Sequence, residues 1–221
     1  MKHQEPEPVA AEPRWPVILT VLVVVVLLVF LPQRVGVFPV WLPYVIGPMI
    51  VTPMFAIWLT GRSQRWLRIE RGMTLCFAAC MCFGTIANVV NLIKTMIHRP
   101  DDVTGLQLLA SGASVWILNV VAFSLIYWQI DRGGPETRRY DKIRPDFLFP
   151  QTGVPDEAPL RWHPTFIDYL SLGFSTATAF STTEVAPLTS RAKLLMMIEA
   201  LTALVTLVII ASRAINIIGS A

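Results

Sequence analysis

Long apolar blocks separated by short polar connectors form the pattern of this chain. The first four blocks cover residues 15–31, 40–60, 73–97 and 106–130, and each reaches or approaches the roughly 20 residues that cross a bilayer as an α-helix. Their apolar residues are not confined to one helical face, which is typical of helices surrounded by lipid or by other helices. The pattern therefore predicts four membrane-spanning helices within residues 15–130.

Helix-breaking and amide residues interrupt three of these blocks. The three prolines of the 40–60 block predict a kinked packing helix, with a hinge or a solute-lining helix as the alternative. Asn88 and Asn91 lie one turn apart in the third block, and Asn119 lies in the fourth. We expect these amides to hydrogen-bond between helices, and the alternative is a polar pathway.

The remaining 91 residues contain a polar stretch and two apolar pieces. Residues 131–163 predict an extramembrane loop, in which the apolar run at 147–150 would lie flat on the membrane surface. Residues 166–183 are apolar but rich in Ser, Thr and Ala, and residues 192–218 predict a final helix. That helix contains Glu199 and Arg213, about 21 Å apart along its axis, so we expect each side chain to reach an opposite membrane surface.

Composition supports a membrane protein: 54% of the 221 residues are hydrophobic and 15% are charged, against about a quarter in a soluble domain. The predicted fold class is all-α, a polytopic transmembrane helix bundle with five or six membrane segments. Its parts are a disordered N-terminal tail (1–14), four transmembrane helices (15–130), a basic cytoplasmic loop (131–163), and a pore-like segment with the final helix (164–221). Three cysteines within one apolar block, Cys76, Cys80 and Cys82, do not make a disulfide framework.

The basic residues orient the predicted helices. The basic residues are Lys2 and Arg14 in the N-terminal tail, four arginines in a basic turn at 61–72 and six residues in the 131–163 loop, whereas the opposite connectors contain Arg34 and Arg99. Since cytoplasmic loops carry the excess of Lys and Arg, the N-terminus and the long loop are predicted to be cytoplasmic. The net charge is +3, and the basic residues lie between the apolar blocks, so the charge does not indicate nucleic-acid binding.

Residues 168–189, DYLSLGFSTATAFSTTEVAPLT, resemble the pore segment of potassium channels without a gap. The matching positions are Asp168, Leu170, Thr176, Thr178, Pro187 and Thr189, and Glu184 stands where the channels have Asp. The resemblance implies a pore segment followed by an inner helix. Its candidate pore residues are Thr176, Thr178, Phe180, Ser181, Thr182, Thr183 and Glu184.

The selectivity filter departs from the channel pattern. Phe180, Ser181, Thr182 and Thr183 replace Val-Gly-Tyr-Gly, so both filter glycines are absent. Carbonyl rings need backbone conformations that glycine adopts readily. The sequence therefore predicts a degenerate, non-selective or non-conducting pore segment. Residues 166–183 either cross the membrane as a short helix or enter and return, and the placement of the C-terminus inside narrowly favours a crossing.

A second resemblance rests on YWQIDRGGP at 127–135, DFLFPQ at 146–151, FIDYL at 166–170 and TATAFS at 176–181. These runs are similar to a widespread bacterial family of multipass membrane proteins, some described as ion-channel-like. The similarity implies a bacterial inner-membrane location and no specific activity.

Three classes of function are weighed. We expect an ion-channel-like or transport-related protein, and the alternative is a structural or partner-binding subunit using the 131–163 loop. An enzyme is not expected, because His3, His98 and His163 lie far apart in sequence and no metal, phosphate-loop or triad pattern is present. No cofactor is expected; the expected partners are the lipid bilayer, a second copy of the chain and a monovalent cation.

Overall fold

The computed structural model describes residues 12–30, 48, 52, 64–98, 105–138, 143–153, 162–178 and 185–219. The described residues are mostly helical, with almost no sheet. The predicted helix at 40–60 lies outside them, except for Pro48 and Thr52.

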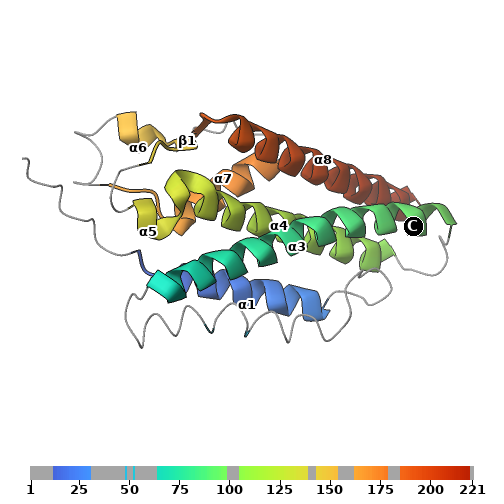
Figure 1. Cartoon of the computed structure of the whole chain (residues 1–221). Coiled ribbons are helices and arrows are strands. Elements are labelled where there is room, and N and C mark those ends of the chain that lie inside the picture. The colour runs from blue at the N-terminus through green and yellow to red at the C-terminus, as the bar shows by residue number, and fades with distance from the viewer. Residues whose placement is uncertain are drawn as a thin grey trace, which may run out of the picture.

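Four long helices and one shorter helix make up the body of the molecule (Figure 1). The long helices are α1 (Trp15–Phe30), α3 (Gln64–His98), α4 (Gly105–Ile130) and α8 (Ser190–Gly219), and the shorter one is α7 (Phe166–Thr178). The spans Arg65–Asn91, Leu109–Gly133 and Ser190–Ser212 are long and apolar enough to cross a membrane. The described residues thus agree with a helical membrane protein, and the number of crossings is treated below as a proposal.

Helix α4 is the centre of the bundle, because α1, α3, α7 and α8 all pack on it. Its side chains Phe123, Tyr127 and Trp128 are almost wholly buried. Helices α4 and α8 run antiparallel, and Gly112 near the start of α4 lies against Ile210 in the later part of α8. Outward-facing α8 residues such as Leu201 remain exposed, as expected of a surface that faces lipid.

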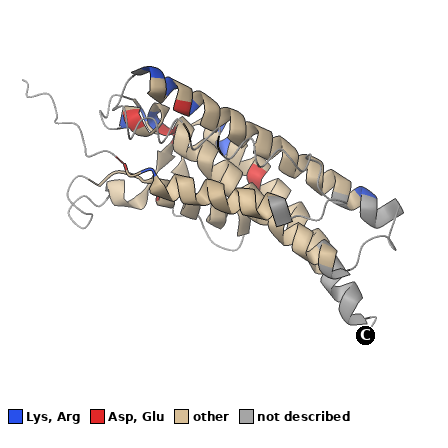
Figure 2. Ribbon diagram, turned by 90° about the horizontal axis from the view of Figure 1, so that it is seen from below, with Lys and Arg blue, Asp and Glu red and all other residues tan. Residues whose placement is uncertain are grey.

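Short elements gather at one end of the bundle, which we call the polar end. They are η1 (Asp131–Gly133), α5 (Pro135–Arg138), β1 (Phe147–Leu148), α6 (Pro150–Gly153) and β2 (Ala186–Pro187). Strand β1 pairs antiparallel with β2, with Phe147 opposite Pro187. Figure 2 shows that most of the coloured basic and acidic residues lie toward this end.

The predicted basic turn at 61–72 is wrong for its described part, because α3 already begins at Gln64. Arg65, Arg68 and Arg71 are exposed, whereas Glu70 is buried. The arginines are spaced three apart, so a helix places them on one side while Glu70 points into the bundle. The helix therefore continues through the connector.

The run at 147–150 does not lie flat on a membrane surface as predicted. Phe147 and Phe149 are buried against Tyr169, whereas Leu148 between them is exposed. Alternate residues of an extended segment point to opposite sides, which sends both rings inward. This packing fastens the segment after α4 to the start of α7.

Candidate functional site

Helix α7 starts at the polar end and runs into the bundle along α4. At its start the ring of Phe166 contacts that of Trp128. Near its end the Ala177 carbonyl accepts a hydrogen bond at 3.4 Å from Nε1 of Trp116, which lies about three turns closer to the start of α4 than Trp128 does. Its 13 residues give a length of about 20 Å, which is shorter than the roughly 30 Å hydrocarbon core of a bilayer.

The chain after α7 comes back to the end from which α7 started. Strand β2 pairs with β1, and the ring of Phe147 in β1 lies 6.4 Å from that of Tyr169 in the first turn of α7. Helix α8 then begins beside them at Ser190. The described parts of residues 166–187, which are α7 and β2, therefore begin and end at the polar end. We call these residues the α7 hairpin.

Two of the seven candidate pore residues lie within the described part of the hairpin. The hydroxyls of Thr176 and Thr178 bond the α7 carbonyls of Leu172 and Ser175, at 2.8 and 3.0 Å. Both hydroxyls are thus used within the helix. The other five lie outside the described residues: Phe180, Ser181, Thr182, Thr183 and Glu184.

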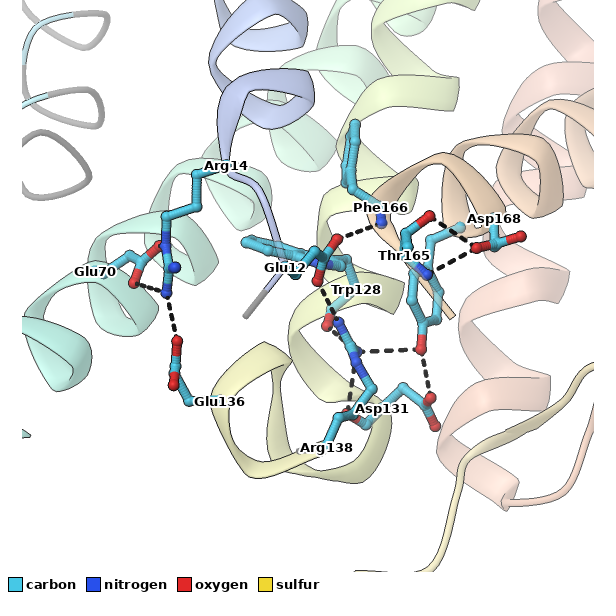
Figure 3. Close-up of polar contacts among 11 residues, drawn as sticks. Glu12, Arg14, Glu70, Trp128, Asp131, Glu136, Arg138, Thr165, Phe166 and Asp168 are labelled. Atoms are coloured by element: carbon cyan, nitrogen blue, oxygen red, sulfur yellow. Dashed lines mark hydrogen bonds and ion pairs between the residues drawn. The ribbon is translucent and has the colours of Figure 1, made fainter. Parts of the chain in front are cut away.

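Asp168, which the channel resemblance had included, caps α7. Its carboxylate accepts hydrogen bonds from the backbone N–H and the hydroxyl of Thr165, at 2.7 and 2.8 Å (Figure 3). Thr165 and Asp168 stand three apart, which is the spacing of a capping box. This local signal was readable in the sequence and fixes where α7 begins.

Glu12, expected in a disordered tail, ties three elements together at the polar end (Figure 3). Its carboxylate oxygens lie 3.0 and 3.1 Å from Trp128 Nε1 of α4, and it also accepts from the backbone N–H of Phe166 at 2.5 Å. Arg138 of α5 completes the contact at 3.4 Å. An acid at the first turn of α7 also suits the positive end of the helix dipole.

Arg14 makes a second link across the polar end. Its guanidinium contacts Glu70 of α3 through two nitrogens, at 2.6 and 3.1 Å, and Glu136 of α5 at 2.9 Å. Forked contacts of this kind are the strongest arginine–carboxylate arrangement. Glu12 and Arg14, which were predicted to lie in a disordered tail of residues 1–14, are therefore held by contacts with the bundle.

Asp131 and Arg138 form the buried centre of the polar end. Asp131 accepts from the backbone N–H of Asp146 at 2.6 Å and from the hydroxyl of Tyr169 at 2.5 Å. Arg138 Nη1 donates to the Trp128 carbonyl at 2.7 Å and to the Tyr169 hydroxyl oxygen at 3.1 Å. Burial raises the pKa of Tyr169 well above its ordinary value, so the phenol stays neutral and donates to Asp131.

The start of α8 is held by Asp146, which is wholly buried. Its carboxylate pairs with Arg191 at 2.5 Å and accepts from the Thr189 hydroxyl at 2.6 Å. The Asp146 carbonyl also accepts from the backbone N–H of Leu188 at 2.8 Å. Each acid described at the polar end thus has a partner, which is what a structural role requires.

A different arrangement lies at the interface of α4, α7 and α8. Glu199 is 0% exposed and accepts a hydrogen bond from the Tyr127 hydroxyl at 2.5 Å through Oε2. It is nine residues into α8, about 14 Å along the helix and near the middle of the candidate membrane span Ser190–Ser212. The prediction that Glu199 reaches a membrane surface is therefore wrong, because Tyr127 of α4 draws it inward. The Arg213 side chain lies outside the described residues.

Gly173 allows the α7 hairpin to approach this carboxylate closely. A Cβ atom on Gly173 would lie 2.4 Å from Ser124 Oγ, 3.1 Å from the Val120 carbonyl oxygen and 3.3 Å from Glu199 Oε1. Small residues at helix contacts permit such approach in membrane proteins. The three helices therefore meet at one oxygen-lined contact, which we call the Glu199 site: Glu199, Tyr127, Asn119, Ser124 and Gly173.

Sequence reasoning had assigned Asn119 either to packing or to a polar pathway. Its amide Nδ2 donates to the Glu199 carbonyl at 3.3 Å, so it does bond between helices. Among the described residues, no three His, Cys, Asp or Glu side chains are grouped so that they could hold a metal ion. The Glu199 site therefore offers oxygen ligands from a single acid and neutral groups.

No family model, curated protein or solved structure matches this chain.

Proposed function

We propose that this chain is a transport-related, ion-channel-like membrane protein in which the α7 hairpin, α4 and α8 line a route for a small monovalent cation. The observation that carries the proposal is the hairpin itself. Helix α7 is too short to cross, packs against the long apolar helices α4 and α8, and is followed in sequence by β2 at the end where α7 began. Non-helical backbone at membrane depth is tolerated where protein or a water-filled path surrounds it.

The order of elements supports this reading. The resemblance to potassium channels implied a pore segment followed by an inner helix, and α7, β2 and α8 follow in this order. Hydroxyl-bearing residues continue past α7 through Ser181, Thr182 and Thr183 to Glu184. Because the filter glycines are replaced, we propose passage without potassium selectivity.

The charge distribution supports a cytoplasmic polar end. Exposed arginines of α3, the arginines around α5 and the first residues of α8 lie there, and cytoplasmic segments carry such an excess. Helix α1 leaves this end and α3 starts from it, so the predicted helix at 40–60 would supply the return. We propose five crossings in the bacterial inner membrane, with the N-terminus inside and the hairpin entering from the cytoplasm.

The alternative, a partner-binding subunit that uses the 131–163 loop, has less support. Several side chains of its described residues are already engaged within the chain. Phe147 and Phe149 pack inward, and Arg138 and Asp146 are buried in internal hydrogen bonds. The loop's described residues are therefore better explained as the frame that holds the hairpin.

Cation flux into liposomes containing the purified chain tests the proposal. We expect flux of K⁺ and Na⁺ above that of empty liposomes, with little preference between them. Glu184→Gln should reduce it, because an acid near the hairpin concentrates cations. Glu157→Gln, which removes an acid of the 131–163 loop, is the matched control and should leave the flux unchanged. The absence of flux of any monovalent cation, protons included, would contradict the proposal.

A further inference from the structure

The second carboxylate oxygen of Glu199 is a buried acceptor with no donor among the described residues. Tyr127 satisfies Oε2, whereas Oε1 faces the contact with Gly173 of the α7 hairpin. Buried carboxyl groups are normally fully hydrogen-bonded, and an isolated charge in hydrocarbon is costly. Among the described residues, the other acids have no buried oxygen of this kind, although the amides of Asn119, Gln129 and Gln151 also contain buried atoms without a hydrogen bond.

Asn119 of α4 also contains a buried acceptor without a donor, at the same contact between α4 and α8. Its Nδ2 is bonded to the Glu199 carbonyl, yet its Oδ1 also lacks a donor among the described residues. Both orphaned atoms accept hydrogen bonds and cannot donate them while Glu199 is ionised. Two such acceptors on one buried contact need a hydrogen-bond donor or a positive charge.

The neighbours of Glu199 do not bring that charge. Tyr127 of α4 and Cys82 of α3 are the titratable groups close enough to interact with it. Helix α7 presents Gly173 and no ionisable side chain to the carboxylate. Among the described residues, no lysine or arginine forms an ion pair with Glu199.

We propose that Glu199, assisted by Asn119, reversibly binds the monovalent cation that this protein moves, either a proton or an alkali-metal ion. The proposal rests on the function proposed above and adds to it a binding site. Position favours this role, because the carboxylate lies near the middle of the membrane and touches the hairpin. A proton and an alkali-metal ion would bind to the same groups, because each brings positive charge to the acceptor oxygens of Glu199 and Asn119. Tyr127 keeps one oxygen fixed and leaves the other for the cation.

Infrared difference spectroscopy of the protein in liposomes tests the site without requiring transport. Spectra are recorded between acid and alkaline pH, and between Na⁺, K⁺ and a large organic cation at one pH. We expect a carboxyl signal that changes in one of these series and is lost in Glu199→Gln. A change with pH alone assigns the proton, and a change with Na⁺ or K⁺ at constant pH assigns an alkali-metal ion.

The matched control is Thr206→Val, which removes another buried polar group of α8, bonded only to its own helix in the described structure. It should keep the Glu199 signal. A Glu199 carboxyl signal that responds to neither series would overturn the proposal and leave Glu199 a permanently protonated structural group.

Flux measurements separate this proposal from the broader one. Glu199→Gln should fold as the wild type does and lose cation flux, whereas Thr206→Val should keep it. If wild-type flux is present and Glu199→Gln leaves it unchanged, the binding site is wrong and the proposed function stands. If no cation passes but the infrared signal responds as expected, the proposed function fails and the site stands.

Discussion

The buried acids of the polar end and of the Glu199 site differ in how fully they are hydrogen-bonded. At the polar end, Asp131 and Asp146 are wholly buried, and each accepts several hydrogen bonds from within the chain. At the Glu199 site one carboxylate oxygen and one amide oxygen have no donor among the described residues. Saturated buried acids hold a fold together, whereas an unsaturated acid at mid-membrane depth marks a place where something binds.

The two regions are connected through the α7 hairpin. Its first turn is fastened to the polar end by Glu12, Tyr169 and the cap at Asp168. Its middle lies against the Glu199 site at Gly173. The rigid frame at one end thus positions the hairpin against the carboxylate, which predicts that substitutions at the frame change stability and those at the site change transport.

The largest expected effect is on stability at the polar end. Arg138→Leu removes the ion pair with Glu12 and the donor that the Trp128 carbonyl and the Tyr169 hydroxyl oxygen share. Breaking one partner of a buried ionic network costs about 3–5 kcal/mol. Thermal unfolding in detergent measures this loss. Arg65→Leu, at an exposed position on α3, is the control and should change stability by less than about 0.5 kcal/mol. Equal effects of the two substitutions would contradict the structural role of Arg138.

Gly173→Ala tests the close approach of the hairpin. The new methyl would lie 3.1 Å from the Val120 carbonyl oxygen and closer still to Ser124 Oγ, so the helices must separate. Overpacking of this kind costs about 1–3 kcal/mol. Gly72→Ala is the matched control, because nothing lies within 4 Å of a Cβ there, and it should stabilise α3 by up to about 1 kcal/mol. Comparable destabilisation at both glycines would show that α7 does not approach α4 as described.

Glu12→Gln tests whether the N-terminal residues are part of the frame. The glutamine amide has the shape of the carboxylate but not its charge. It therefore loses the ion pair with Arg138 and weakens the hydrogen bonds that the carboxylate accepts from Trp128 and Phe166. Hydrogen bonds to charged groups contribute about 1.5–3 kcal/mol, and partial exposure of Glu12 places the expected loss near the lower limit. Thermal unfolding in detergent measures this loss. Glu7→Gln is the control in the same tail, and a loss as large there would refute a specific role for Glu12.

Glu199→Gln should have the smallest effect on stability, and it distinguishes most sharply between Glu199 and the structural acids of the polar end. The substitution removes a buried charge that no described cation compensates, so we expect a change of less than about 1 kcal/mol, of either sign. Asp146→Asn is the counterpart at the polar end and should destabilise by several times as much. Unfolding of both variants is followed in the same detergent. If Glu199→Gln were the more destabilising of the two, Glu199 would belong with the structural acids.

Much of the fold follows from local features of the sequence. The apolar runs at 73–97 and 106–130 predicted α3 and α4 well, because the bilayer imposes a minimum helix length. The start of α3 was missed although the arginine spacing in the connector was already helical. The boundary of α7 was likewise readable from Thr165 and Asp168.

The site was less accessible from sequence. Tyr127 stands 72 residues before its hydrogen-bond partner Glu199, and Glu12 stands 154 residues before Phe166. Periodicity shows on which face of a helix a residue lies, but it does not show which helix that face meets. The sequence therefore predicted that Glu199 reaches a membrane surface and that Glu12 lies in a disordered tail. The packing of the helices places Tyr127 beside Glu199 and Phe166 beside Glu12.

The path of the α7 hairpin is the central claim, and cysteine accessibility tests it most directly. A single cysteine is placed at position 181 or 184 in a chain lacking Cys76, Cys80 and Cys82, and an impermeant thiol reagent is applied from each side of the membrane. The account predicts labelling from the cytoplasmic side only, the same side that labels a cysteine at exposed Arg65. Labelling from the opposite side would show that residues 166–183 cross the membrane, and would contradict the hairpin.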